Sequence, residues 1–281
     1  MSISHVEGHR DVAPGRSAYW QAWLPPSLAR AIVVIVHGYG EHSARYSHVG
    51  ARLAGSGFAA YAADHRGHGR SDGPRANLER MELVVDDLHS FVRFAIERHP
   101  GLPVFAVGHS LGGLIALQYA TTPNTSLDGL VLSGPAVEVT VGSPLLKRLA
   151  GALSTLTPNL GVATLDVSQI SRDPEVVRAY RADPLVHHGK VPARTGAEIL
   201  LTTEALPARL PRLSMPLLLL HGSEDRICAP AGSTMVHDGV SSTDKTLRHY
   251  EGLCHEIFNE PEQEKVLTDL VSWLETHLPP R

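Results

Sequence analysis

A serine between glycines, Ser110, has the sequence setting of a catalytic nucleophile. Residues 108–112 read Gly-His-Ser-Leu-Gly and match the pattern G-x-S-x-G. The apolar run Val104–Val107 precedes the pattern and a helical pattern follows it, which is the strand–turn–helix context that the motif requires. Such a turn exposes the serine hydroxyl at the start of a helix, where backbone N–H groups stabilise negative charge. The sequence therefore predicts nucleophilic catalysis by Ser110.

A serine nucleophile needs a base, and the base needs an acid that orients it. In this arrangement the acid follows the nucleophile in the chain and lies after a late strand. The apolar run Leu217–Leu220 predicts such a strand, and Glu224 and Asp225 come shortly after it. We favour Asp225 as the acid and interpret Glu224 as a solvated loop carboxylate.

The base is expected after the next strand. Residues Thr246–Tyr250 predict that strand, and His255 follows it in the loop before the last predicted helix. A histidine in this loop can reach over the edge of the sheet to the nucleophile. The rival, His249, lies inside the strand pattern, so we favour His255.

The tetrahedral intermediate of acyl transfer needs two N–H donors for its oxyanion. Leu111, directly after the nucleophile, is expected to supply one. The loop His37-Gly38-Tyr39-Gly40-Glu41-His42 follows the first buried strand, and its glycines let the backbone approach the site closely. We assign the second donor to Tyr39.

The elements that must position these residues are short apolar runs that alternate with longer amphipathic segments. This alternation predicts an α/β fold with a mostly parallel, doubly wound sheet and right-handed crossovers. Pro261 is expected in the first turn of the closing helix. The predicted strands are residues 31–36, 58–63, 104–107, 127–132, 217–220 and 246–250, and the predicted helices are 82–99, 110–121, 230–239 and 261–277.

The alternation stops between residues 136 and 210, which lack strand-like runs. Helix starts are indicated at Ser143–Pro144 and at Asp173–Pro174–Glu175. An apolar stripe before Pro158 either packs on the sheet domain or meets lipid, and the pattern leaves both open. We expect a catalytic core of residues 1–135 and 211–281, interrupted by a helical cap of residues 136–210. The stripe consists of Leu145, Leu149, Leu153 and Leu156.

Composition narrows the class of protein. The 281 residues are 43% hydrophobic and 19% charged, as in a globular protein, and the net charge of -4 argues against a nucleic-acid binder. Only two cysteines, Cys228 and Cys254, are present, which fits a reducing compartment. No secretory signal and no apolar run near the ~18 residues of a membrane span is found. We expect a cytoplasmic protein, and a peripheral association with a membrane is compatible with the sequence.

The seventeen histidines do not indicate a metal site. The sequence contains neither HExxH nor CxxC. His5 and His9 are four residues apart, but the segment between them contains Gly8 and does not predict a helix. We therefore expect no metal site.

Four placed motifs carry a family resemblance. They are HGYGEHSARY at 37–46, DHRGHGRSDG at 64–73, GHSLGG at 108–113, and HGSEDRIC at 221–228 with YEGLCHE at 250–256. Together they resemble the α/β-hydrolase superfamily and, more narrowly, the monoacylglycerol lipases, over the chain outside the cap. The resemblance implies cofactor-free hydrolysis of 1- and 2-monoacylglycerols to fatty acid and glycerol, with a small lipid as the substrate. It matches Ser110, Asp225 and His255 to the family triad, and Tyr39 and Leu111 to the oxyanion donors.

The resemblance also implies residues that bind the substrate. Glu41 matches a carboxylate near the glycerol headgroup, Arg45 a neighbour that orients its loop, and Tyr180 a cap tyrosine near the alcohol exit. One position departs from the family. Some members carry a second histidine three residues after the catalytic one, where this chain has Phe258. Headgroup preference is therefore open.

Two alternatives remain. A lysophospholipase or a general carboxylesterase would have the same fold and the same triad. A non-catalytic receptor on this fold is the other, although a complete triad argues against it. Cys228 lies three residues after Asp225, so a thiol is expected near the pocket, where a small buried apolar role is favoured over catalysis.

Overall fold

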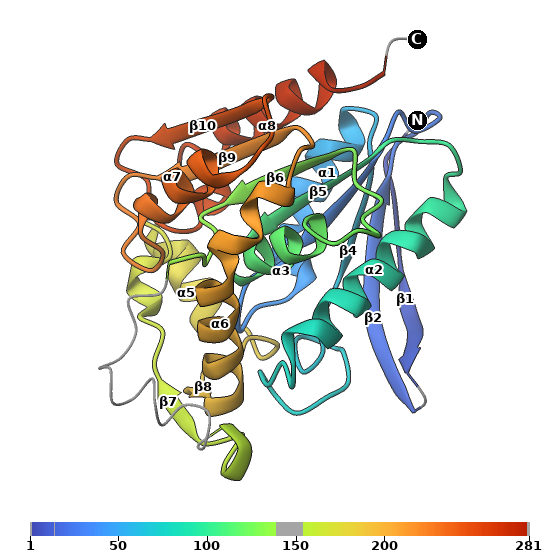
Figure 1. Cartoon of the computed structure of the whole chain (residues 1–281). Coiled ribbons are helices and arrows are strands. Elements are labelled where there is room, and N and C mark those ends of the chain that lie inside the picture. Colours follow the sequence, from blue (N-terminus) through green and yellow to red (C-terminus); the bar gives the residue numbers. More distant parts are fainter. Residues whose placement is uncertain (1, 14, 139–153, 280–281) are drawn as a thin grey trace.

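The computed structural model describes residues 2–13, 15–138 and 154–279. Eight strands form one sheet in the order β1-β2-β4-β3-β5-β6-β9-β10 (Figure 1). The pairs β1–β2 and β2–β4 are antiparallel, and every other neighbouring pair is parallel. The predicted mostly parallel α/β sheet is confirmed. The strands are β1 Ser4–Ala13, β2 Arg16–Leu24, β3 Ile32–Val36, β4 Ala59–Ala63, β5 Val104–His109, β6 Gly129–Ser133, β9 Leu217–Gly222 and β10 Lys245–Tyr250.

The central strands read as continuous apolar runs because both faces of the sheet are covered. Along β5, Val104 and Ala106 pack into one core, and Phe105 and Val107 pack into the other. Helices α2, α3 and α7 contribute to the first core, and α1 and α8 to the second. These helices are α1 Ser47–Gly55, α2 Met81–Arg98, α3 Leu111–Ala120, α7 Pro230–Gly239 and α8 Gln263–Thr276.

The predicted elements of the core are found within about two residues of their expected ends, which is the usual scatter of such boundaries. The expectation for Pro261 is wrong, because α8 begins only at Gln263. The N–H of Gln263 donates to the carbonyl of Glu260 at 2.9 Å. This bond closes a turn, so Pro261 lies before the helix.

Among the α-helices and β-strands described in the core, three were not predicted: β1, β2 and α1. β1 is an exposed edge strand in which polar residues dominate, so it lacks an apolar pattern. α1 contains glycine at position 50, a poor helix former. A Cβ at Gly50 would lie 2.1 Å from the ring of Trp23 on β2, so close packing against the hairpin requires this glycine.

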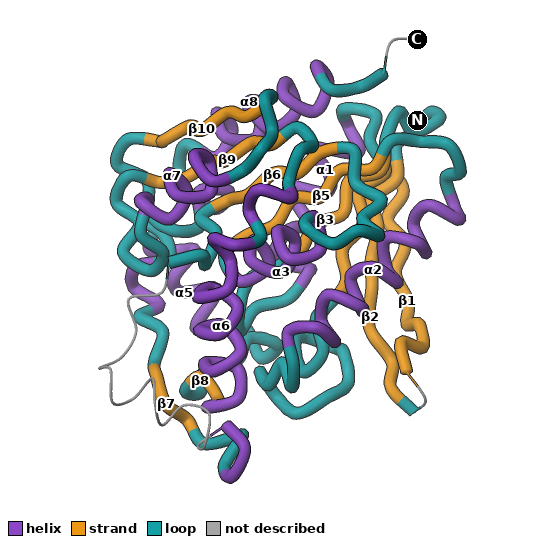
Figure 2. The backbone as a smooth tube through the Cα atoms, in the orientation of Figure 1, coloured by secondary structure: helices purple, strands orange, loops and turns teal. Residues whose placement is uncertain are grey.

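The segment between β6 and β9 contains helices, as expected, but also strands. β7 and β8 pair antiparallel and lie apart from the main sheet (Figure 2). The expectation of a segment without strands is therefore wrong. With three residues in β7 and two in β8, these strands are too short to give a recognisable apolar run in the sequence. The described part of this segment includes β7 Gly161–Ala163, η2 Val167–Gln169, α5 Pro174–Ala182, β8 Val191–Pro192, α6 Ala193–Ala205, η3 Leu206–Ala208 and η4 Leu210–Arg212.

The start of α5 is as predicted. Asp173 caps the helix by accepting the N–H of Glu175 at 2.8 Å, and Pro174 occupies the first turn. The predicted start at Ser143–Pro144, with Leu145, Leu149 and Leu153 of the stripe, lies outside the described residues. The fourth leucine of the stripe, Leu156, is 80% exposed. None of the helices in the described part of the chain is long and apolar enough to cross a membrane.

Candidate active site

Ser110 lies on a strained turn between β5 and α3. Its backbone has φ 52° and ψ -119°, a left-handed conformation that residues other than glycine rarely adopt. The flanking glycines are required by close approach: a Cβ at Gly108 would lie 2.6 Å from the Gly112 carbonyl oxygen, and one at Gly112 would lie 2.1 Å from that of Val36. The turn holds the Ser110 side chain at the end of the sheet, where a pocket opens.

Asp225 and His255 form a buried hydrogen-bonded pair. His255 Nδ1 donates to Asp225 Oδ2 at 2.7 Å, and the other carboxylate oxygen accepts the N–H groups of Ile227 and Cys228, each at 2.9 Å. Burial alone would raise the pKa of Asp225, but the neighbouring His255 and the donated hydrogen bonds outweigh it and hold this pKa well below its usual range. Asp225 is therefore a permanent anion that can orient an imidazole. The alternative acid, Glu224, faces solvent.

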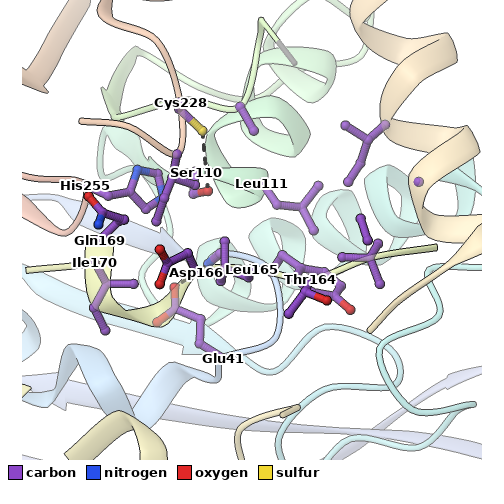
Figure 3. A pocket seen from close by; sticks show the side chains of 18 of the residues that line it. Glu41, Ser110, Leu111, Thr164, Leu165, Asp166, Gln169, Ile170, Cys228 and His255 are labelled. Carbon is purple, nitrogen blue, oxygen red and sulfur yellow. Dashed lines mark hydrogen bonds between the residues drawn. The ribbon is translucent and has the colours of Figure 1, made fainter. Parts of the chain in front are cut away.

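Ser110 and His255 line the same pocket (Figure 3). The structure thus brings the three residues of the predicted triad together, whereas the rival His249 is exposed on β10. Within the described residues, the hydrogen bond of the Ser110 hydroxyl is a long one of 4.0 Å to Cys228 Sγ. Cys228 lies at the pocket, as expected, and burial raises the pKa of its thiol, which keeps it protonated and weakly nucleophilic.

Leu111 and Tyr39, the residues expected to supply the oxyanion donors, line the same pocket. Leu111 opens α3, so its N–H is one of the first-turn donors without an intrahelical acceptor. Tyr39 lies in the loop after β3, and both Tyr39 and Gly38 line the pocket. A hydrogen bond within this loop restrains its backbone: the N–H of Gly38 donates to Glu41 Oε1 at 2.6 Å.

A buried ion network holds that loop. Glu41 accepts the Gly38 N–H, the Tyr46 hydroxyl at 2.6 Å and Arg45 Nη1 at 2.7 Å. Arg45 also donates two hydrogen bonds of 2.7 Å to Glu256, the residue after His255. Burial raises the pKa of Glu41 despite the nearby guanidinium, while at Glu256 burial is outweighed by Arg45, so the pKa of Glu256 is lowered.

The three expected substrate-binding residues lie together, but not in the same way. Glu41 and Tyr180 line the pocket, whereas Arg45 lies behind Glu41 and is not among the described lining residues. The Arg45 guanidinium lies 4.6 Å from the centre of the Tyr180 ring, a cation–π contact. Sequence reasoning missed Glu256, whose only sequence signal is its position next to His255.

The pocket has a volume of about 410 Å³, within the range of small-molecule sites. Its lining includes the polar residues Glu41, Gln169 and His255 and the apolar residues Ile199 and Leu200 of α6. The shape and lining fit a molecule with a polar end and an apolar chain.

Phe258 does not face this pocket. Its side chain is 2% exposed and packs in the core between the sheet and helices α1 and α8. Among the described residues, no group of three or more His, Cys, Asp or Glu side chains is placed to hold a metal ion.

Comparisons with known proteins agree with this geometry. The family model described as "Serine aminopeptidase, S33" (Hydrolase_4) matches residues 27–262. A monoacylglycerol lipase of Mycolicibacterium smegmatis is 45% identical over 92% of this chain and 93% of the relative, and a human monoglyceride lipase is 35% identical over 88% and 82%. The crystal structure of a Paleococcus ferrophilus monoacylglycerol lipase superposes with a TM-score of 0.82 at 32% identity, covering 99% of this chain and all of that one. The chain therefore belongs to this serine-hydrolase family of the α/β-hydrolase fold and, within it, to the monoacylglycerol lipases.

Proposed function

We propose that this protein hydrolyses monoacylglycerols to fatty acid and glycerol, with Ser110 as nucleophile, His255 as base and Asp225 as the acid that orients it. The observation that carries the proposal is the buried Asp225–His255 pair beside Ser110, at a pocket lined by both polar and apolar residues. The similarity to monoacylglycerol lipases supports the choice of substrate.

The reaction proceeds in two steps. His255 takes the proton of Ser110 as its oxygen attacks the ester carbonyl, and the N–H groups of Leu111 and Tyr39 stabilise the oxyanion. His255 then gives the proton to the glycerol oxygen as the C–O bond breaks, which leaves an acyl-enzyme. Water, deprotonated by His255, attacks the acyl carbon, and the fatty acid leaves as Ser110 recovers its proton. Asp225 stabilises the imidazolium in both steps.

We assign residues 136–210 to a cap over the catalytic core of residues 1–135 and 211–281. Both α5 and α6 supply lining residues of the pocket. In this arrangement Ile199 and Leu200 of α6 contact the acyl chain, and Glu41 and Tyr180 face the glycerol end. No cofactor takes part.

The decisive experiment compares mono-, di- and triacylglycerols with lysophosphatidylcholine and p-nitrophenyl butyrate at matched concentrations. The proposal expects monoacylglycerols to have the highest kcat/KM, and a fluorophosphonate probe to label the wild type but not Ser110→Ala. Equal rates on monoacylglycerols and simple esters would indicate a general carboxylesterase, and preference for the lysolipid a lysophospholipase. Absence of labelling and turnover would favour a receptor.

We further propose that the protein is cytoplasmic and that the cap contacts membranes peripherally. Among the described residues of the cap, three leucines are exposed: Leu156 by 80%, Leu160 by 49% and Leu201 by 60%. Replacing Leu156 and Leu201 with Asp should reduce co-sedimentation with liposomes. The matched control is Leu28→Asp, because Leu28 is 94% exposed but lies in the loop between β2 and β3. Equal binding by all variants would contradict the proposal.

A further inference from the structure

His221 is a buried histidine that the mechanism above does not use. It lies on β9, and its side chain is fully buried. His221 Nε2 lies 3.1 Å from Asp225 Oδ2 and 3.0 Å from the Cys228 carbonyl oxygen. Its other ring nitrogen, Nδ1, lies 2.7 Å from Ser233 Oγ on α7. The imidazole therefore connects a helix to the proposed catalytic acid.

The partners of His221 determine its tautomer. An ionised carboxylate and a backbone carbonyl can only accept hydrogen bonds, so Nε2 must carry the hydrogen. A neutral imidazole then presents a lone pair at Nδ1, which accepts the hydroxyl hydrogen of Ser233. The direction of donation thus runs from Ser233 to His221 and from His221 to Asp225, and every polar atom of the ring is satisfied without charge.

This donation completes the hydrogen bonding of Asp225. A carboxylate offers about four acceptor positions. On Oδ1 they are taken by the N–H groups of Ile227 and Cys228, and on Oδ2 by His221 and His255. With four donors around it, the carboxylate has a fixed plane, and the direction in which Oδ2 faces His255 Nδ1 is set.

We propose that His221 and Ser233 are positioning residues of the hydrolytic reaction, which fix the Asp225 carboxylate and, through it, the tautomer and orientation of His255. This inference rests on the proposed function of the triad. Ser233 donates to His221, His221 donates to Asp225 Oδ2, and His255 donates to the same carboxylate oxygen.

The surroundings favour this role over simple packing. The end of β9 lies against the loop that carries His255, because a Cβ at Gly222 would lie 2.2 Å from the Cys254 carbonyl oxygen and 2.3 Å from that of Leu253. The hydrogen bonds of His221 also contribute to the low pKa of Asp225, which keeps the carboxylate an acceptor. An apolar side chain would fill the same space but would leave Oδ2 with one donor fewer.

The test measures kcat and KM for p-nitrophenyl butyrate, together with the thermal midpoint, for four variants. His221→Leu should lower kcat by about 30-fold and leave KM within about twofold. Replacing the hydrogen-bond partners of metal-bound histidines, a comparable change, typically costs about 10–100-fold in metal affinity or activity. His221→Gln keeps an N–H donor and should recover most of kcat. Ser233→Ala should lower kcat by about fivefold, the effect of one net hydrogen bond. The packing control is Leu220→Ala, the buried neighbour on β9, which should lower the thermal midpoint but not kcat.

Several results would overturn the proposal. They are a kcat of His221→Leu close to that of the wild type, a His221→Gln variant as impaired as His221→Leu, or an equal loss of kcat in Leu220→Ala. If His221→Leu does not fold, an unchanged kcat of Ser233→Ala overturns it. The simple ester separates this inference from the substrate proposal, because a wild type that cleaves butyrate but not monoacylglycerols refutes only the latter. Full activity of Ser110→Ala would refute the triad itself.

Discussion

Arg45 donates two hydrogen bonds of 2.7 Å to the carboxylate of Glu256, one from each terminal nitrogen. Arg45 follows the loop that carries the proposed oxyanion donor Tyr39, and Glu256 follows the proposed base His255. Both side chains are at most 10% exposed. This bidentate pair therefore joins two of the loops on which the proposed chemistry depends, and planar fork geometry is what favours arginine over lysine there.

Breaking this pair should cost stability. A buried charge left wholly unpaired costs about 3 kcal/mol or more, but in Glu256→Gln Arg45 keeps Glu41 and loses only its bidentate partner, so we expect a cost of about 2 kcal/mol. We expect the free energy of unfolding in urea at pH 7.5 to fall by about that amount. The control is Glu262→Gln, whose carboxylate pairs with Arg172 at the surface and should contribute below about 1 kcal/mol. Equal losses in the two variants would mean that the buried pair contributes no more than the exposed one.

Glu41 should affect turnover more than substrate affinity. Three of its acceptor positions are taken by Gly38, Tyr46 and Arg45, which leaves little capacity for glycerol. Glu41→Gln should loosen the oxyanion loop and lower kcat by about tenfold on both monoacylglycerol and p-nitrophenyl butyrate, since one oxyanion donor is worth about 100-fold or more.

The control for this change is Glu224→Gln, a carboxylate exposed beside the proposed acid, which should leave kcat unchanged. A Glu41→Gln variant with a raised KM for monoacylglycerol alone and normal turnover of the butyrate would instead support a direct headgroup contact.

Much of the site could be predicted because parallel strands end at the same edge of the sheet. Ser110, Asp225 and His255 each follow a strand that an apolar run reveals, so their proximity follows from topology. His221 and Glu256 could not be found in this way. His221 acts through side-chain contacts with Asp225 and Ser233, 4 and 12 residues away, and Glu256 through a contact with Arg45, 211 residues away. No periodic pattern in the sequence encodes these contacts.

Weak local patterns also explain why the sequence did not predict some of the helices and strands. β1 carries polar residues on an exposed edge, and β7 and β8 are too short for periodicity. The helix α1 tolerates Gly50 only because Trp23 occupies the space of a side chain. In each element tertiary contacts override a weak local preference.

Buried histidines should make the protein sensitive to acid. Burial lowers the pKa of His65 to about 4 and the pKa values of His68 and His109 to about 3. The unfolded chain titrates near pH 6.5, so between about pH 4 and 6.5 it binds protons that the folded protein does not, and stability falls as the pH falls. Each such histidine contributes about 1.4 kcal/mol per pH unit.

Urea unfolding at pH 7.5, 6.0 and 5.0 measures this slope. The variant His68→Asn can replace the hydrogen bond of 3.0 Å between His68 Nδ1 and the Arg66 carbonyl, and it should reduce the slope by about 1 kcal/mol per pH unit. The exposed His249 provides the control, and His249→Gln should leave the slope unchanged. A slope that is the same in both variants and the wild type would show that His68 is not neutral in the folded protein.

The absence of a side chain at Gly196 on α6 should leave room in the pocket for a long acyl chain. It lines the pocket, and a Cβ there would meet Val162 Cγ2 at 3.5 Å, an ordinary contact. Gly196→Ala should therefore keep activity and stabilise the helix by about 0.5–1 kcal/mol. Gly196→Leu adds four carbons, three more than Gly196→Ala, at a position that lines the pocket. We expect kcat/KM for a C16 monoacylglycerol to fall by about tenfold or more relative to that for C8, since overpacking costs about 1–3 kcal/mol. An unchanged C16 to C8 ratio in Gly196→Leu would mean that the acyl chain takes a path away from α6.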